Sequence, residues 1–131
     1  MRIGVLALQG AFVEHAAILR RLDVEAVPVR LPKGLEGLDG LIIPGGESTT
    51  ISHLMQDFEL MQPVRDLAKH GLPIMGTCAG MILMARGLSD GPVETLGLMD
   101  IRIRRNAFGR QADSFETNLE IPVLKIGRAH V

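Results

Sequence analysis

Residues 73–85 read Pro-Ile-Met-Gly-Thr-Cys-Ala-Gly-Met-Ile-Leu-Met-Ala. The first four residues predict a short buried strand, and the residues after Gly80 are apolar on every side, which predicts a buried helix. Between the two elements, Thr77-Cys78-Ala79 is flanked by glycines. This composition is typical of a nucleophile elbow, a sharp turn in which small neighbours allow a reactive side chain to occupy a strained backbone position.

Strands and helices alternate along most of the chain. Near-continuous apolar runs predict buried strands, and apolar residues at helical spacing predict the helices between them. The predicted strands before the elbow are 3–8, 25–31 and 41–43, and the predicted helices are 12–22, 49–57 and 60–70. Pro28 indicates an edge position for the second strand, because proline cannot donate to a β-ladder. Alternating polar and apolar residues predict half-exposed strands at 98–104 and 115–123.

This order of elements predicts one α/β domain with a mostly parallel sheet covered by helices on both faces. Gln9-Gly10, Gly45-Gly46 and Cys78 each follow a predicted strand. The carboxyl ends of parallel strands lie at one edge of a sheet, which is where folds of this class bind ligands. We therefore expect the three turns to meet there.

The composition argues against several classes of protein. The 131 residues are 47% hydrophobic and 22% charged, which is sufficient for one domain with a substantial core. The formal charge is −1, with 14 basic and 15 acidic residues interspersed, and only 3% of residues are aromatic. Neither value favours binding of nucleic acid or of an anionic membrane. No segment has the roughly 18 apolar residues of a membrane helix.

Cysteine usage and the N-terminus indicate a cytoplasmic protein. The chain has a single cysteine, so no intrachain disulfide can form, and its N-terminus leads into patterned structure rather than into a cleavage site. One cysteine and four scattered histidines also lack the spacing of metal ligands. We expect no metal and no cofactor.

Cys78 is the candidate nucleophile. A thiol at a helix N-terminus faces the positive end of the helix dipole, which favours the reactive thiolate. The alternative from the residues alone is an inert thiol in a turn of small residues.

The loop Pro44-Gly45-Gly46-Glu47-Ser48-Thr49-Thr50 also joins a strand to a helix. It lacks the spacing and the lysine of a phosphate-binding loop. It can instead form an oxyanion hole, with a glycine N–H and the Ala79 N–H as the two donors. A tight turn with Ser48 as the helix N-cap is compatible with that interpretation.

Four segments together resemble one family. In order, they are Leu8-Gln9-Gly10-Ala11-Phe12-Val13-Glu14-His15, residues 44–50, residues 76–80 and Arg105-Asn106-Ala107-Phe108-Gly109-Arg110-Gln111. Their order and approximate spacing are similar to those of the glutaminase subunit of pyridoxal 5'-phosphate synthase, a class I glutamine amidotransferase. The resemblance covers residues 1 to about 120 and implies a three-layer, flavodoxin-like α/β sandwich that is incomplete at its C-terminus.

The resemblance implies hydrolysis of L-glutamine to glutamate and ammonia, with the ammonia passing to a separate synthase (lyase) subunit that makes the pyridoxal phosphate. It assigns the attack to Cys78, oxyanion N–H groups to Gly46 and Ala79, and glutamine contacts to Gly46, Glu47, Ser48 and Arg105. A guanidinium suits that role because it can hold an α-carboxylate by two parallel hydrogen bonds. Gln9 and His15 are candidates for the partner interface.

The family's thiol is served by a histidine that is followed two residues later by a glutamate, and neither is found here. The four histidines are His15, His53, His70 and His130, and none has an acidic residue two positions later. His53 and His70 fall in or at the ends of predicted amphipathic helices, so we expect them on the surface. Turnover by this chain is expected to be low, because a nucleophile without its base loses orders of magnitude in rate.

The expected domain limits follow from the same comparison of motifs. Residues 1–124 are expected to form a partial glutamine amidotransferase domain. Residues 125–131, Lys-Ile-Gly-Arg-Ala-His-Val, match nothing in the family and do match one reading frame of a common sequencing adapter. We predict that they are a non-native tail.

Two other functions remain open. The chain could dock on the synthase without catalysis, as a binding module. It could also be related to small elbow-cysteine proteins that act on reactive carbonyls or as chaperones, although the segment from Arg105 to Gln111 disfavours that interpretation.

Overall fold

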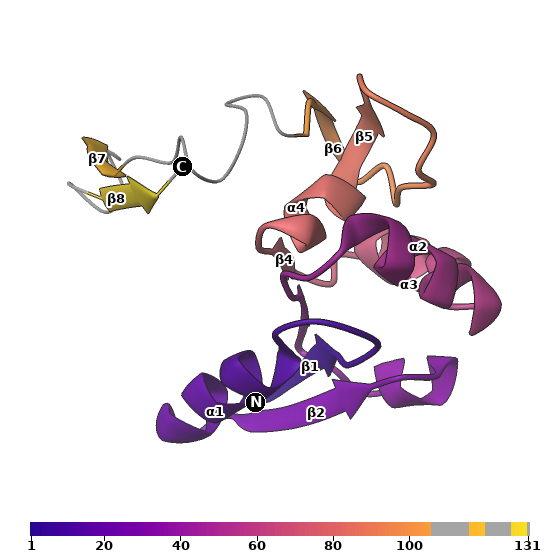
Figure 1. Cartoon of the computed structure of the whole chain (residues 1–131). Coiled ribbons are helices and arrows are strands. Elements are labelled where there is room, and N and C mark those ends of the chain that lie inside the picture. Colours follow the sequence, from indigo (N-terminus) through magenta and orange to yellow (C-terminus); the bar gives the residue numbers. More distant parts are fainter. Residues whose placement is uncertain (106–115, 120–126, 131) are drawn as a thin grey trace.

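A four-stranded parallel sheet forms the centre of the protein in the computed structural model, which describes residues 1–105, 116–119 and 127–130 (Figure 1). Its strands are β1 (Arg2–Leu6), β2 (Glu25–Val29), β3 (Gly40–Ile43) and β4 (Ile74–Gly76), and their order is β2-β1-β3-β4. All three pairings are parallel. The strand that contains Pro28 therefore lies at an edge of this sheet, as predicted.

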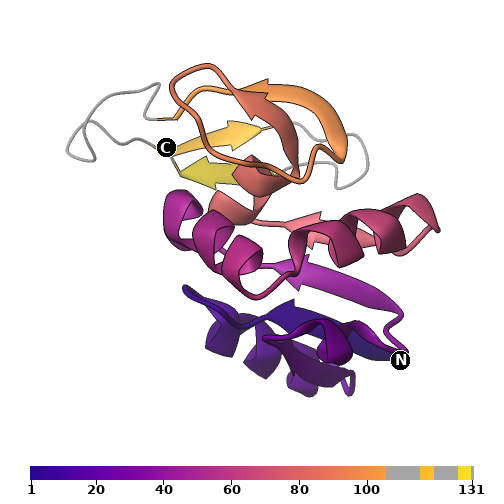
Figure 2. The same cartoon turned by 90° about the vertical axis from the view of Figure 1, so that its right-hand side faces the viewer.

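Helices cover both faces of the sheet. They are α1 (Phe12–Arg21), a 3-10 turn η1 (Pro32–Leu35), α2 (Ser48–Asp57) and α3 (Met61–Lys69). The chain moves across the sheet in one direction from β1 to β2 and in the other from β3 to β4. Since such crossovers are right-handed, α1 lies on one face and the pair α2 and α3 on the other, as Figure 1 and the turned view in Figure 2 show. The predicted α/β class is thereby confirmed.

The core lies between the sheet and the helices α2, α3 and α4 (Ala79–Met84). The members of this core cluster that are no more than 1% exposed are Leu6, Val29, Leu41, Ile43, Ile51, Met55, Leu60, Val64, Ala79 and Leu83. Fully burying one such side chain contributes about 1.5–3 kcal/mol before conformational entropy is subtracted. The inner strand β3 is buried at every position, as its continuous apolar run predicts.

The chain after the elbow differs from the prediction. The helix α4 (Ala79–Met84) has only six residues, and Met81 within it is 45% exposed, so the expectation of a helix buried on every side is wrong. Strand β5 (Ala85–Leu88) begins directly at the next residue and pairs in parallel with β6 (Met99–Ile103). The helix ends here because Leu96 and Leu98 bond to its last two carbonyls: the Leu96 N–H donates to the Leu83 carbonyl at 2.7 Å and the Leu98 N–H to the Met84 carbonyl at 2.9 Å.

Two further strands, β7 (Glu116–Leu119) and β8 (Gly127–His130), form an antiparallel pair. Strand β7 falls within the predicted strand 115–123, and the remainder of that prediction lies outside the described residues. The half-exposed strand predicted at 98–104 is confirmed by β6 and its alternating exposure. Within the described part of the chain, none of the helices has the length and apolar character needed to cross a membrane.

Candidate active site at the carboxyl edge of the sheet

The three predicted turns meet at the carboxyl edge of the sheet. The N–H of Ala11 donates to the Gly45 carbonyl at 2.9 Å, which joins the turn after β1 to the turn after β3. The N–H of Thr77 donates to the Ile43 carbonyl at 3.1 Å, which joins β3 to the elbow. A Cβ added at Gly45 would lie 3.3 Å from the Cβ of Cys78. The turns are therefore in direct contact, as expected.

Cys78 has the backbone of a nucleophile elbow. Its φ of 52° and ψ of −112° place a non-glycine residue in a region that L-residues rarely adopt. The neighbours make this possible, because a Cβ at Gly80 would overlap the Ile43 carbonyl oxygen and a Cβ at Gly76 would lie 2.6 Å from the Gly80 carbonyl oxygen. The thiol itself is exposed. The chain thus holds an accessible thiol on a strained turn.

Glu47, and not Ser48, caps helix α2. The Glu47 carboxylate accepts hydrogen bonds from the N–H groups of Thr49 at 3.2 Å and Thr50 at 2.7 Å, and from the Thr50 hydroxyl at 2.7 Å. These bonds, above all that from the Thr50 hydroxyl, lower the pKa of Glu47 below its ordinary 4.5. Ser48 is the first helical residue and is buried. The Glu47 carboxylate is thus engaged in the cap, and its carbonyl accepts from the Ile51 N–H at 3.0 Å, so this residue holds the start of α2 in place.

Gln9 and His15 contact the protein's own turns. The Gln9 Oε1 accepts from the Glu47 N–H at 2.9 Å, and the His15 Nε2 lies 3.2 Å from the Thr77 hydroxyl. Both residues are half-buried. These bonds join the turn after β1 to the loop that precedes α2, and helix α1 to the elbow. The role of Gln9 and His15 in a partner interface remains a prediction.

Arg105 reaches the same edge from the end of β6. Its Nη1 lies 3.4 Å from the Ser48 hydroxyl and 3.3 Å from the Thr49 hydroxyl, and its Nε lies 3.5 Å from an Asp90 carboxylate oxygen. The Arg105 side chain is only 25% exposed. A residue far away in the sequence therefore brings a positive charge beside the double-glycine turn.

One cavity of about 370 Å³ collects these residues. It is lined by Gly46, Glu47, Ser48, Cys78, Ala79, Ile82 and Arg105. All but one of these were candidates from the sequence, and the volume is within the range of small-molecule sites. Ile82, four residues after Cys78 and thus on the same helix face, was missed although its spacing could have indicated it. Nothing in the sequence indicated Thr49 or Asp90.

The histidines that the structure describes do not serve the thiol. His53 and His70 are exposed, as predicted. His15 bonds to Thr77, and no hydrogen bond joins Cys78 to a histidine within residues 1–105. Over the described ranges there is also no group of three or more His, Cys, Asp or Glu that could hold a metal ion.

The fold and the site define an α/β protein with an elbow cysteine beside a double-glycine turn. The chain belongs to the SNO glutamine amidotransferase family, which it matches over residues 5–128. The family resemblance drawn from the four sequence segments is confirmed by this match.

The relatives bear the name of one enzyme subunit. The chain is 61% identical over 124 residues to the pyridoxal 5'-phosphate synthase subunit PdxT of Moorella thermoacetica, covering 95% of this chain and 66% of the relative. It is 59% identical over 127 residues to the subunit of the same name from Herpetosiphon aurantiacus, covering 95% and 67%. The chain thus spans about two thirds of the length of these relatives.

The fold also has a solved counterpart. A crystal structure of a glutamine amidotransferase superposes with a TM-score of 0.90 at 45% sequence identity, over 98% of this chain and 69% of that protein. The flanked, mostly parallel sheet described above is therefore the architecture of this family.

Proposed function

We propose that this chain carries the nucleophile and most of the substrate pocket of a glutaminase. The Cys78 thiolate attacks the side-chain amide carbon of L-glutamine, and the carbonyl oxygen becomes an oxyanion that the N–H groups of Gly46 and Ala79 stabilise. Collapse of this intermediate expels ammonia, with a proton supplied by a general acid, and leaves a glutamyl thioester. Water then hydrolyses the thioester to glutamate and regenerates the thiol.

The observation that carries this proposal is the shared cavity. A nucleophile, a double-glycine turn and a guanidinium line one space of about 370 Å³. In the proposed complex Arg105 binds the α-carboxylate of glutamine at one end, so that the side-chain amide reaches Cys78 at the other. Gly46, Glu47 and Ser48 contact the substrate from the loop after β3.

The name of the relatives supports a proposal for where the ammonia goes. They are subunits of pyridoxal 5'-phosphate synthase, so we propose that ammonia passes to the synthase (lyase) partner for vitamin B6 formation. Gln9 and His15 lie at the same edge and are the proposed contacts with that partner. A catalytic thiol that must stay reduced fits the cytoplasm.

We also propose that turnover by this chain alone is slow. No imidazole within residues 1–105 is bonded to Cys78, and removing the base from a nucleophile–base pair costs several orders of magnitude in rate. A module that docks on the synthase without catalysis is the alternative that this observation favours.

Covalent labelling tests the pocket without requiring turnover. The chain is incubated with 6-diazo-5-oxo-L-norleucine, an electrophilic analogue of glutamine, and the modified residue is found by mass spectrometry. We expect one adduct at Cys78, slowed by L-glutamine but not by D-glutamine, and none in Cys78→Ser. Labelling that L-glutamine leaves unchanged would contradict the proposed substrate.

Ammonia release distinguishes the enzyme from the binding module. It is measured for this chain and for the chain extended by the remaining third of the Moorella relative, each with and without the synthase subunit. Activity in the extended protein supports the glutaminase proposal. If neither protein releases ammonia and the chain still binds the synthase, the docking module is supported.

A further inference from the structure

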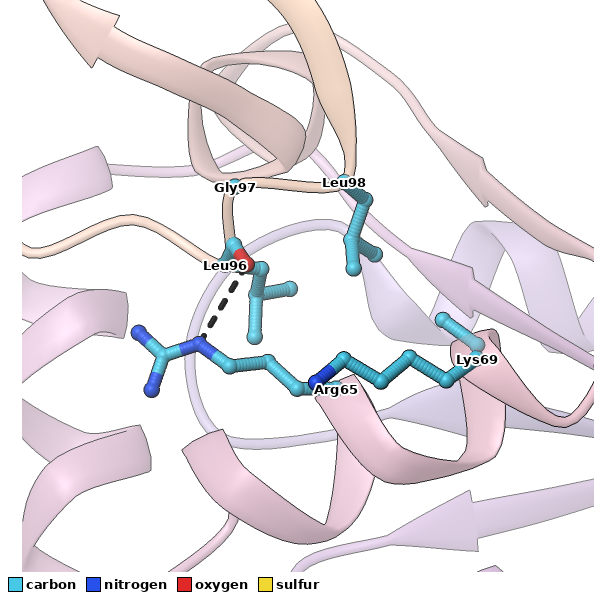
Figure 3. A pocket seen from close by; sticks show the side chains of 6 residues that line it. Arg65, Lys69, Leu96, Gly97 and Leu98 are labelled. Carbon is cyan, nitrogen blue, oxygen red and sulfur yellow. Dashed lines mark hydrogen bonds between the residues drawn. The ribbon is translucent and has the colours of Figure 1, made fainter.

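The loop between β5 and β6, residues 89–98, is fixed at its far end against helices α2 and α3. Ser52 of α2 and Arg65 of α3 donate to three successive carbonyls of the loop. The bonds are Ser52 Oγ to Glu94 O at 2.7 Å, Arg65 Nη2 to Thr95 O at 2.7 Å and Arg65 Nε to Leu96 O at 3.2 Å. Figure 3 shows Arg65 reaching the Leu96 carbonyl beside a cavity of about 310 Å³. Leu96 itself is 3% exposed and belongs to the core.

The near end of the same loop is also fixed, and it presents Asp90 to Arg105. The Ser89 N–H donates to the Ile103 carbonyl at 2.9 Å, which ties the loop to β6. The next residue places its carboxylate 3.5 Å from the Arg105 Nε, and the two side chains are 30% and 25% exposed. Asp90 therefore does not extend freely from a mobile segment but is held on a loop anchored at both ends.

The Arg105 guanidinium has neighbours on two sides. Asp90 faces its Nε, and the Ser48 and Thr49 hydroxyls lie near its Nη1. An arginine side chain loses rotamer entropy when it is ordered, so a site that orders it in advance binds its ligand more tightly. With Nε facing Asp90 and Nη1 facing the two hydroxyls, Nη2 is the nitrogen that remains for a ligand carboxylate among the described contacts.

We propose that Asp90 is a positioning residue that orders Arg105 and thereby sets the preference of the site for an amide substrate with a free α-carboxylate. This inference rests on the proposed glutaminase function. Asp90 is not among the residues that line the Cys78 cavity, whereas Arg105 is, so Asp90 acts on the cavity only through Arg105. The opposite role, a carboxylate that competes with the substrate for Arg105, predicts tighter binding when Asp90 is removed.

The test measures protection of Cys78 against iodoacetamide in the full chain. Protection constants are determined for L-glutamine and for 4-aminobutanamide, which is L-glutamine without its α-carboxylate. We expect Asp90→Ala to weaken protection by L-glutamine about fivefold and to leave protection by 4-aminobutanamide unchanged, so that the ratio between the two falls. Asp90→Asn, which keeps an oxygen to accept from Nε, should recover part of the loss.

A second aspartate–arginine pair supplies the matched control. Asp100 lies 2.9 Å from Arg86 and is 88% exposed, so Asp100→Asn should leave both constants unchanged. A purely structural role of Asp90 would weaken both ligands equally, and competition would strengthen L-glutamine; either result overturns the inference. Arg105→Ala distinguishes failure of the proposed glutamine site from failure of the Asp90 inference. If L-glutamine protects wild type but not Arg105→Ala, the proposed site is supported, and the Asp90 variants then test the positioning role. No protection of wild type contradicts the proposed function and this inference together.

Discussion

Gly80 is the position at which a single methyl group does the most harm to the elbow. A Cβ there would overlap the Ile43 carbonyl oxygen, which belongs to the backbone of an inner strand and cannot move aside. We expect Gly80→Ala to lower the free energy of unfolding by about 1–3 kcal/mol or more and to slow labelling of Cys78. Gly87→Ala is the control, because a Cβ at that position meets nothing within 4 Å. Urea denaturation measures the difference, and equal loss in both variants would contradict the packing account.

The backbone of Cys78 stores strain that a glycine would relieve. At φ 52° a side chain of any kind is unfavourable, and residues in such regions cost about 1–3 kcal/mol. We therefore expect Cys78→Gly to be more stable than Cys78→Ala by about 1 kcal/mol, after the extra chain entropy of glycine is subtracted. At His53, an exposed position within α2, the same comparison should favour alanine. If glycine were also worse than alanine at position 78, the elbow would not be strained.

At the level of elements, the start of α2 should respond to acid. Because the cap lowers the pKa of Glu47 below 4.5, its stabilising contribution is complete above that pH and is lost as the pH falls through the folded value. We expect the melting temperature of wild type to fall more between pH 7 and pH 3 than that of Glu47→Gln. Glu14→Gln, in the first turn of α1, is the control and should keep the wild-type acid sensitivity. Parallel curves for wild type and Glu47→Gln would contradict the cap.

The sequence predicted the elements of the central sheet because each carries a strong local signal. The runs that became β1 and β3 are continuously apolar, and Pro28 alone placed β2 at an edge. Strand β5 was missed because only Ala85 of it belongs to the apolar run 81–85, and the three remaining residues, Arg86-Gly87-Leu88, are too few to show the periodicity of a strand. Hydrogen bonds from Leu96 and Leu98 to the last two carbonyls of α4 determine where the helix ends and β5 begins. No local sequence pattern predicts these bonds. The cap was misassigned for a similar reason, since serine is a common N-cap and glutamate is not.

The motifs of the candidate site could be predicted from the sequence, but the residues that hold Arg105 in place could not. Cys78 and the double-glycine turn follow strands that parallel topology brings to one edge, so sequence order was enough to join them. Asp90 meets Arg105 from the loop 89–98, which Arg65 and Ser52 anchor, and Thr49 meets it from the start of α2. Such contacts between distant segments produce no periodic pattern in the sequence, so they cannot be predicted from it.

For the molecule as a whole, we predict self-association through β4, an edge strand of the described sheet with an exposed apolar side chain. Met75 in the middle of this strand is 51% exposed, and in the described sheet β4 pairs only with β3. Strands with apolar side chains and free backbone groups at an edge promote aggregation. We expect light scattering to rise with protein concentration and Met75→Lys to reduce it at least severalfold. Leu22→Lys, at a 67% exposed residue outside the strands, should not help, and equal improvement by both would indicate an effect of net charge alone.

The glycines of the three adjoining turns have a consequence for how this protein can vary. A side chain at Gly10 would strike the Gly45 carbonyl, one at Gly46 would strike Gln9, and one at Gly80 would strike β3. The three turns are thus in such close contact that a Cβ at any of these glycines would overlap a neighbouring segment. A random library should therefore tolerate substitution at these positions only in coordinated sets, while the outer surface of α1, which has no buried residue, accepts changes one at a time.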